Sequence, residues 1–157
     1  MRLRRPLVSL LVAFAVLAAL VPGASANATR AYTSALVQAI NGARAANGLP
    51  PLHVDPRLAT AARGQSVYLA GIGRLDHTGP DGSNVLQRLT RLGFHGHVAG
   101  EDLAAGMGPG QTVQAWMASP GHRMNLLSPQ YRMLGVAVAM GSLGGMTAPF
   151  VTADFGG

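Results

Sequence analysis

The sequence predicts an α+β domain in which helices come first and antiparallel strands come last. Apolar residues recur every three or four positions in several segments between residues 31 and 119, which indicates amphipathic helices. Two later runs, residues 133–139 and 149–155, are rich in valine, alanine and phenylalanine, and a glycine-rich stretch separates them. This pattern is typical of a β-hairpin, so we expect a layered domain with a largely antiparallel sheet.

Residues 1–26 have the three parts of a secretory signal peptide. A basic end with three arginines precedes the apolar run 7–21, and Ala24-Ser25-Ala26 supplies the small residues expected before a cut after Ala26. We therefore expect a secreted domain over residues 27–157, with no stable membrane insertion once the signal is removed. A retained membrane anchor is the alternative, although no basic stop-transfer flank follows the apolar run.

Four helices are expected in the mature chain. One of them begins at Pro56, with Asp55 as its N-cap, and is ended by Gly71 and Gly73. The other three are expected over residues 31–46, 83–92 and 109–119.

The segments between the helices predict irregular or extended chain. Residues 49–52 form an extended connector, and the glycine-rich segment 94–108 is expected to be loop and short strand. The apolar positions of the helices and strands predict the core, and Val67 is a further candidate. Largely buried side chains are expected at Leu36, Ile40, Leu58, Leu69, Leu86, Leu89, Val113, Trp116, Val136, Val138, Val151 and Phe155.

Composition excludes several kinds of protein. There is no cysteine, so disulfides and thiolate zinc sites are ruled out. All 12 basic residues are arginines, and they are scattered without interleaved aromatics, so nucleic-acid binding is not expected. Removing the signal takes three of them away and lowers the net charge from +6 to +3. The 131 remaining residues suffice for one domain, and we expect a monomer.

Four short phrases stand out along the mature chain. They are Asn41-Gly42-Ala43-Arg44-Ala45-Ala46-Asn47-Gly48-Leu49, His77-Thr78 before a glycine-rich turn, Gly100-Glu101-Asp102-Leu103-Ala104, and Trp116-Met117-Ala118-Ser119-Pro120-Gly121-His122-Arg123-Met124-Asn125-Leu126-Leu127 with Gly135-Val136-Ala137 after it. In this order they resemble the bacterial secreted branch of the CAP superfamily (cysteine-rich secretory protein, antigen 5, pathogenesis-related 1; SCP domain). The resemblance covers about residues 36–155, nearly the whole mature chain.

The resemblance implies a three-layer α/β/α sandwich with a small, largely antiparallel central sheet and a cleft where two histidines and one or two acids converge. His77 and His122 match the two histidines, and Glu101 matches the first glutamate. The second family glutamate falls at Ser119, whose hydroxyl cannot replace a carboxylate as a strong metal ligand or general base. Asp102 stands where the family usually has asparagine.

These cleft residues allow two kinds of chemistry. His77 and His122 could bind a divalent metal such as zinc, with Glu101 either as third ligand or as the group that orients a histidine. Alternatively, Ser119 or Ser66 could act as a nucleophile, with one of the histidines as base and Glu101 orienting it. No Gly-x-Ser-x-Gly elbow supports this second arrangement.

Purely structural roles are equally compatible with the same residues. Glu101 could accept backbone N–H groups and fix its loop, and His122 could be a cap or turn contact after Gly121. Trp116 shares a helix face with Val113 and Met117, so we expect it in the core and not as a ligand platform.

The favoured hypothesis for function is a secreted binding module. Its His/Glu cleft would take an envelope or extracellular ligand, which could be a lipid, a glycan or a peptide, with or without a divalent metal. The resemblance supports this interpretation, because CAP relatives are associated with sterol, lipid and glycan binding. The alternative is a metal-dependent or Ser/His hydrolase of extracellular substrates, so the sequence leaves open whether the protein is an enzyme.

Overall fold

The computed structural model describes residues 22–157, so most of the predicted signal peptide lies outside the described residues. Five helices and four strands follow one another in this part of the chain. They are α1 (Pro22–Ala46), β1 (His53–Val54), α2 (Pro56–Ile72), α3 (Val85–Arg91), β2 (Ala99–Ala105), α4 (Pro109–Ala118), α5 (Pro120–Leu126), β3 (Met133–Leu143) and β4 (Met146–Gly156).

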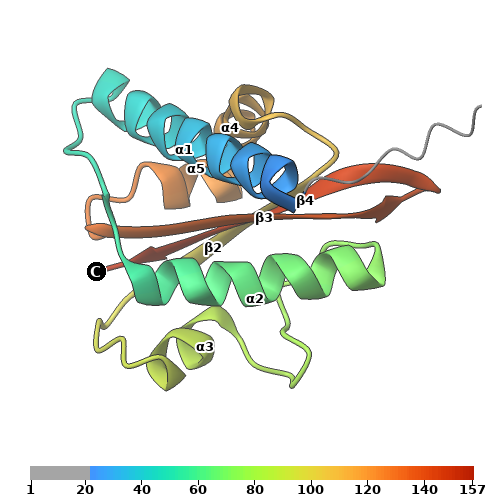
Figure 1. The fold of residues 1–157 in the computed structure, drawn as a ribbon. Coiled ribbons are helices and arrows are strands. Elements are labelled where there is room, and N and C mark those ends of the chain that lie inside the picture. The colour runs from blue at the N-terminus through green and yellow to red at the C-terminus, as the bar shows by residue number, and fades with distance from the viewer. Residues whose placement is uncertain (1–21) are drawn as a thin grey trace, which may run out of the picture.

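The strands form one sheet in the order β1-β3-β4-β2. Only β1 and β3 are parallel, and the other neighbours are antiparallel. Helices α1, α4 and α5 cover one face of the sheet, and α2 and α3 cover the other (Figure 1). The predicted three-layer α/β/α sandwich with a largely antiparallel sheet is therefore confirmed.

Helix α2 lies directly against strand β3. Its start is fixed by Asp55, whose side chain accepts the backbone N–H of Arg57 at 2.8 Å, and its end is closed by Gly73 in the left-handed region at φ 67°. A Cβ on Gly135 of β3 would lie 2.0 Å from the carbonyl carbon of Leu58. Glycine is thus required where helix and strand backbones meet.

Most of the predicted core is buried, with two exceptions and one partial case. Leu86 is 39 % exposed and Val67 is 57 % exposed, so the burial predicted for both is wrong. The inward face of α3 is formed by Val85, Arg88 and Leu89, which leaves Leu86 turned toward solvent. Val138 is only half-buried because it borders an open groove.

Three elements differ from the predicted ones, because α1 begins earlier than expected and neither β1 nor α5 was predicted. Helix α1 begins at Pro22, upstream of residue 31 and of the predicted cut after Ala26. The glycine-rich segment contains loop and one strand, the seven-residue β2, as predicted. A fifth helix, α5, begins at Pro120, because proline ends one helix and is also well tolerated in the first turn of the next. No helix among residues 22–157 is long and apolar enough to cross a membrane.

Candidate functional site

Glu101 is the centre of a buried ionic cluster at the outer edge of the sheet. Strand β2 presents its carboxylate toward α3, and one oxygen lies 2.8 Å from Nδ1 of His77 in the loop between α2 and α3. The other oxygen accepts from the guanidinium of Arg88 on α3. The Glu101 and Arg88 side chains are only 2 % and 9 % exposed, whereas that of His77 is 63 % exposed. Glu101 thus links a buried cation to a solvent-facing imidazole.

This arrangement determines the protonation of His77. The hydrogen bond to Glu101 is the main cause that raises the pKa of His77 above its usual value, although partial burial works in the opposite direction. Arg88 also donates to the backbone carbonyls of His77 and Ser83, so it fixes the loop that carries the histidine. His77 and Glu101 are thus in direct contact, and the roles predicted for them in the cleft stay predictions.

Asp102 points to the opposite face of the sheet, because successive residues of a strand alternate. One of its oxygens accepts from Nδ2 of Asn125 on α5 at 2.7 Å, and the other has no partner among the described residues. Burial raises the pKa of Asp102 to about 7. The same Asn125 amide donates to the carbonyl of Glu101, so the side chain of Asn125 ties α5 to β2 at two neighbouring residues.

Two residues of this cluster, Arg88 and Asp154, were not predicted from the sequence. Asp154 on β4 lies directly across from Glu101, is fully buried, and has no hydrogen-bond partner on either oxygen in the described part of the chain. Burial and the nearby charge of Glu101 raise the pKa of Asp154. A single acid in the apolar run 149–155 was the available signal for Asp154. No sequence signal pointed to Arg88, because a basic residue in a short helix is usually exposed to solvent.

His122 lies in an open groove of about 350 Å³ beside β2. The groove is lined by Leu75, Leu103, Ala104, Ala105, Met107, Ala115, Trp116, Ser119, His122 and Leu143. Burial lowers the pKa of His122, and the charge of His77 adds to this effect. The two predicted histidines are therefore close enough to interact electrostatically, and Ser119 shares the groove with His122.

Trp116 forms part of the floor of this groove and not an exposed platform. Its indole is 2 % exposed and donates to the carbonyl of Leu103 at 3.0 Å. The ring centroids of Trp116 and His122 are 6.4 Å apart with a 41° tilt. The expectation that Trp116 belongs to the core is confirmed.

The serines differ in their access to the histidines. Ser66 is fully buried and donates to the carbonyl of Ala137 and to the hydroxyl of Thr152, so it is not brought into the site. Ser119 ends α4 and precedes α5 without making a side-chain cap, and no hydrogen bond joins it to His122. Of the two proposed nucleophiles, only Ser119 stands at the groove.

The predicted metal ligands do not form a three-residue cluster in the described structure. Within residues 22–157, no three His, Asp or Glu side chains are grouped so that they could hold one metal ion. Both oxygens of Glu101 already have partners, so the carboxylate fits the orienting role better than the role of third ligand. Metal binding by His77, His122 and Glu101 stays a prediction.

Comparisons with known proteins agree on one family. The model of the CAP family, described as the cysteine-rich secretory protein family, matches residues 37–155. The uncharacterized protein YkwD of Bacillus subtilis is 35 % identical over 115 residues, which cover 72 % of this chain and 45 % of YkwD. The chain thus spans less than half the length of this relative.

Solved structures show the same fold. An extracellular protein of Bacillus anthracis that contains an SCP domain matches with a TM-score of 0.72 and 28 % identity, over 88 % of this chain and 44 % of that one. An outer surface protein of Borrelia burgdorferi matches with a TM-score of 0.66 and 25 % identity, over 77 % of this chain and 88 % of that one.

Proposed function

Because the chain belongs to the cysteine-rich secretory protein (CAP) family, we propose that it is an extracellular binding protein whose groove beside His122 holds the apolar part of an amphipathic ligand. The observation that carries this proposal is the lining of that groove, which is apolar apart from Ser119 and His122. The extracellular location is supported by the signal-like residues 1–26 and by a B. anthracis relative described as extracellular.

A lipid with an anionic head is the ligand class that these features favour. Aliphatic side chains and small alanines line the groove, and its one aromatic ring, that of Trp116, is almost fully buried. A glycan would lack an exposed ring to stack on. The raised pKa of His77 favours a positive imidazolium, whose charge acts on His122 in the groove and would attract a carboxylate or phosphate head.

The test is binding of the fluorescent probe 11-(dansylamino)undecanoic acid, followed by its emission. Ala115 is exposed on α4 and lines the groove, so Ala115→Trp should fill the groove without disturbing the core. We expect this variant to bind at least about tenfold more weakly than the wild type. Gln114→Trp is the matched control, because Gln114 is exposed on the same helix outside the groove lining, and it should bind normally.

Two results would count against the proposal. One is the absence of saturable binding by the wild type, and the other is equal binding by the two tryptophan variants. Displacement of the probe by envelope glycans or peptides, and not by fatty acids, would move the ligand class away from lipids.

The hydrolase alternative is favoured by one observation, the 2.8 Å contact between His77 and Glu101. An acid that orients an imidazole is the usual support of a general base. This alternative expects ester or amide turnover that Ser119→Ala and Glu101→Gln abolish while probe binding persists. Equilibrium dialysis against zinc, with His77→Ala and His122→Ala as controls, separately tests the metal hypothesis.

A further inference from the structure

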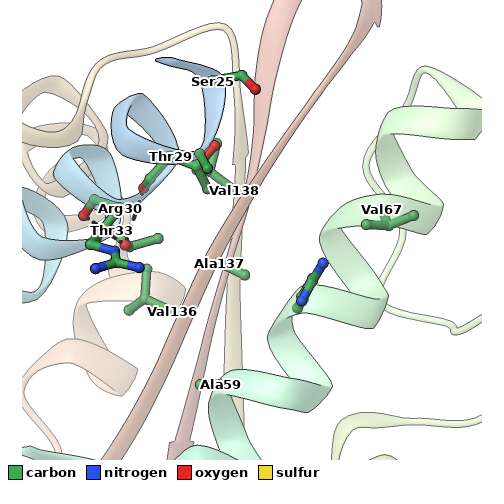
Figure 2. A pocket seen from close by; sticks show the side chains of 11 residues that line it. Ser25, Thr29, Arg30, Thr33, Ala59, Val67, Val136, Ala137 and Val138 are labelled. Carbon is green, nitrogen blue, oxygen red and sulfur yellow. Dashed lines mark hydrogen bonds between the residues drawn. The ribbon is translucent and has the colours of Figure 1, made fainter. Parts of the chain in front are cut away.

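A second groove lies along the open edge of β3 between α1 and α2 (Figure 2). It shares no lining residue with the groove beside His122. Its volume is about 580 Å³. It is lined by Ser25, Ala26, Thr29, Arg30 and Thr33 of α1, by Ala59, Arg63 and Val67 of α2, and by Val136, Ala137 and Val138 of β3. None of these residues belongs to the His/Glu cluster or to the groove beside His122.

The floor of this second groove is a strand edge without a neighbour. Strand β1 has only two residues and pairs with β3 at Met133 and Leu134 alone. Among the described residues, β3 therefore has no strand beside it on that side from Gly135 to Leu143, while β4 pairs with it along the other side. Unpaired backbone groups of this kind are a template for another extended chain.

The backbone groups that face the groove can be identified. On the β1 side, the N–H groups of His53 and Asp55 donate to the carbonyls of Arg132 and Leu134. Because backbone direction alternates along a strand, Val136, Val138 and Met140 also direct their N–H and C=O groups away from β4. These three residues can pair with an added strand without disturbing the existing sheet.

The charged side chains on the two helices that flank this groove are all positive. Arg30 on α1 and Arg63 on α2 are exposed, and neither forms a salt bridge in the described part of the chain. None of the lining residues is acidic. Figure 2 shows β3 passing between the helix that carries Thr29, Arg30 and Thr33 and the helix that carries Ala59 and Val67. An occupant of the groove would thus meet one arginine from each face of the sheet.

From these features we infer that the edge of β3 binds an extended, acidic peptide of a partner protein, which adds a strand to the sheet. Adjacent residues of a strand point to opposite faces, so two neighbouring acidic residues would reach toward Arg30 and Arg63 respectively. Main-chain hydrogen bonds to β3 would supply affinity, and the two arginines would select for acidic side chains. The arginines, threonines and strand edge all lie downstream of the predicted cut after Ala26.

The probe is a fluorescein-labelled peptide of sequence Thr-Val-Glu-Glu-Val-Thr, and the readout is fluorescence anisotropy with the purified protein. We expect saturable binding that weakens at least about tenfold when the two glutamates are replaced by glutamine. A peptide that keeps both glutamates but carries N-methyl groups on alternate amides should also bind weakly. Its methylated amides cannot donate hydrogen bonds to the backbone carbonyls of β3. Equal binding of the N-methylated and unmodified peptides would overturn strand addition.

Variants of the protein test the same two components. Arg63→Glu should abolish binding, whereas Arg123→Glu, at an exposed arginine outside the groove, should have little effect. Val138→Pro removes an N–H that points away from β4, so it should preserve the sheet and reduce binding. If Val138→Pro fails to fold, Arg63→Glu still decides the role of charge.

Hydrogen exchange measured by NMR locates the bound peptide. Peptide binding should slow exchange at the amides of Val136, Val138 and Met140 while leaving those of Ala137 and Ala139, already paired with β4, unchanged. Protection of the same amides at high protein concentration without peptide would instead assign the edge to a second copy of the chain. Protection confined to the groove beside His122 would overturn the inference.

Discussion

Replacing Arg88 by methionine tests whether the buried ion pair with Glu101 organises the site. The substitution keeps much of the aliphatic volume of the side chain but leaves Glu101 without its buried cation. Only the exposed His77 then still contacts this carboxylate, which lies beside the buried acid Asp154. Breaking one partner of a buried pair costs about 3–5 kcal/mol. This loss is a large part of the free energy of unfolding of a typical domain. For a domain of this size we expect the melting temperature to fall by about 12–20 °C.

The same helix offers a matched control. Arg91 lies one turn further along α3 and pairs with Asp81, but these two side chains are 59 % and 50 % exposed, against 9 % and 2 % for Arg88 and Glu101. Because solvent screens an exposed pair, Arg91→Met should change the melting temperature by only a few degrees.

The assay is thermal unfolding followed by circular dichroism. Adding Glu101→Gln to Arg88→Met removes the buried carboxylate that has lost its arginine and should recover part of the lost stability. The reasoning would be refuted if Arg88→Met proved no more destabilising than Arg91→Met, or if Glu101→Gln made the Arg88→Met protein less stable still.

Three further predictions concern the cleft, the core and the N-terminus. Glu101→Gln should lower the pKa of His77, because the carboxylate is the main cause of its increase, and an unchanged NMR titration of the His77 ring would contradict this. Gly135→Ala should destabilise the fold by about 3 kcal/mol or more in urea unfolding, since its Cβ would collide with the backbone of α2. Gly64→Ala, at an open position within α2, should instead stabilise by about 0.5–1 kcal/mol. Mass spectrometry of the secreted protein should find Asn27 at its N-terminus.

The elements that the sequence predicted well are those whose evidence is local. Asp55, Pro56 and Gly73 define α2 by their own backbone preferences, and each has the expected role in the structure. The hairpin of β3 and β4 follows from two apolar runs around Gly144 and Gly145, which adopt positive φ. Such signals depend on a few neighbouring residues, so sequence reasoning can interpret them without knowing the fold.

The elements that the sequence failed to predict depend on distant partners. Strand β1 exists only because β3 passes beside His53 and Val54, and two residues carry too little pattern to predict a strand. Arg44 and Arg88 would be placed on the surface by their type, yet both are buried. The Arg44 guanidinium donates to the carbonyls of Pro50, Leu126 and Ser128. Only the assembled fold brings such acceptors together.

Several residues of the site were predicted, but most of the hydrogen bonds that join them to other residues were not. His77 and Glu101 could be identified by resemblance, and the structure joins them, but the resemblance did not point to Arg88 or Asp154. The partner of Asp102 also comes from another layer, since Asn125 belongs to α5, which was not expected to be a helix. Hydrogen-bond partners far apart in sequence cannot be inferred from spacing alone.

Asp102 and His77 together predict how stability depends on pH. Burial raises the pKa of Asp102 from 3.8 to about 7, so the folded state holds a proton that the unfolded state releases above pH 4. The pKa of His77 is also raised, so its contribution is fully present below its unfolded pKa of about 6.5 and is lost as pH rises through its folded pKa. Asp102 therefore makes stability fall as the pH rises from about 4 to about 7, and His77 adds to the fall only above about pH 6.5.

Asp102→Asn separates the two contributions. The asparagine oxygen can still accept from Asn125, but it cannot ionise, so the variant should melt at a higher temperature than the wild type at pH 8, with a gap that narrows steadily toward pH 4. A shift of about three pKa units sets an upper limit of roughly 4 kcal/mol on the gain, and relaxation of the site will make it smaller. Melting curves from pH 4 to 9 measure the effect, with His77→Gln as the control that should retain the contribution of Asp102. If wild type and Asp102→Asn ran parallel across this range, the carboxyl at position 102 would be ionised in the folded protein throughout, and burial could not be what sets its pKa.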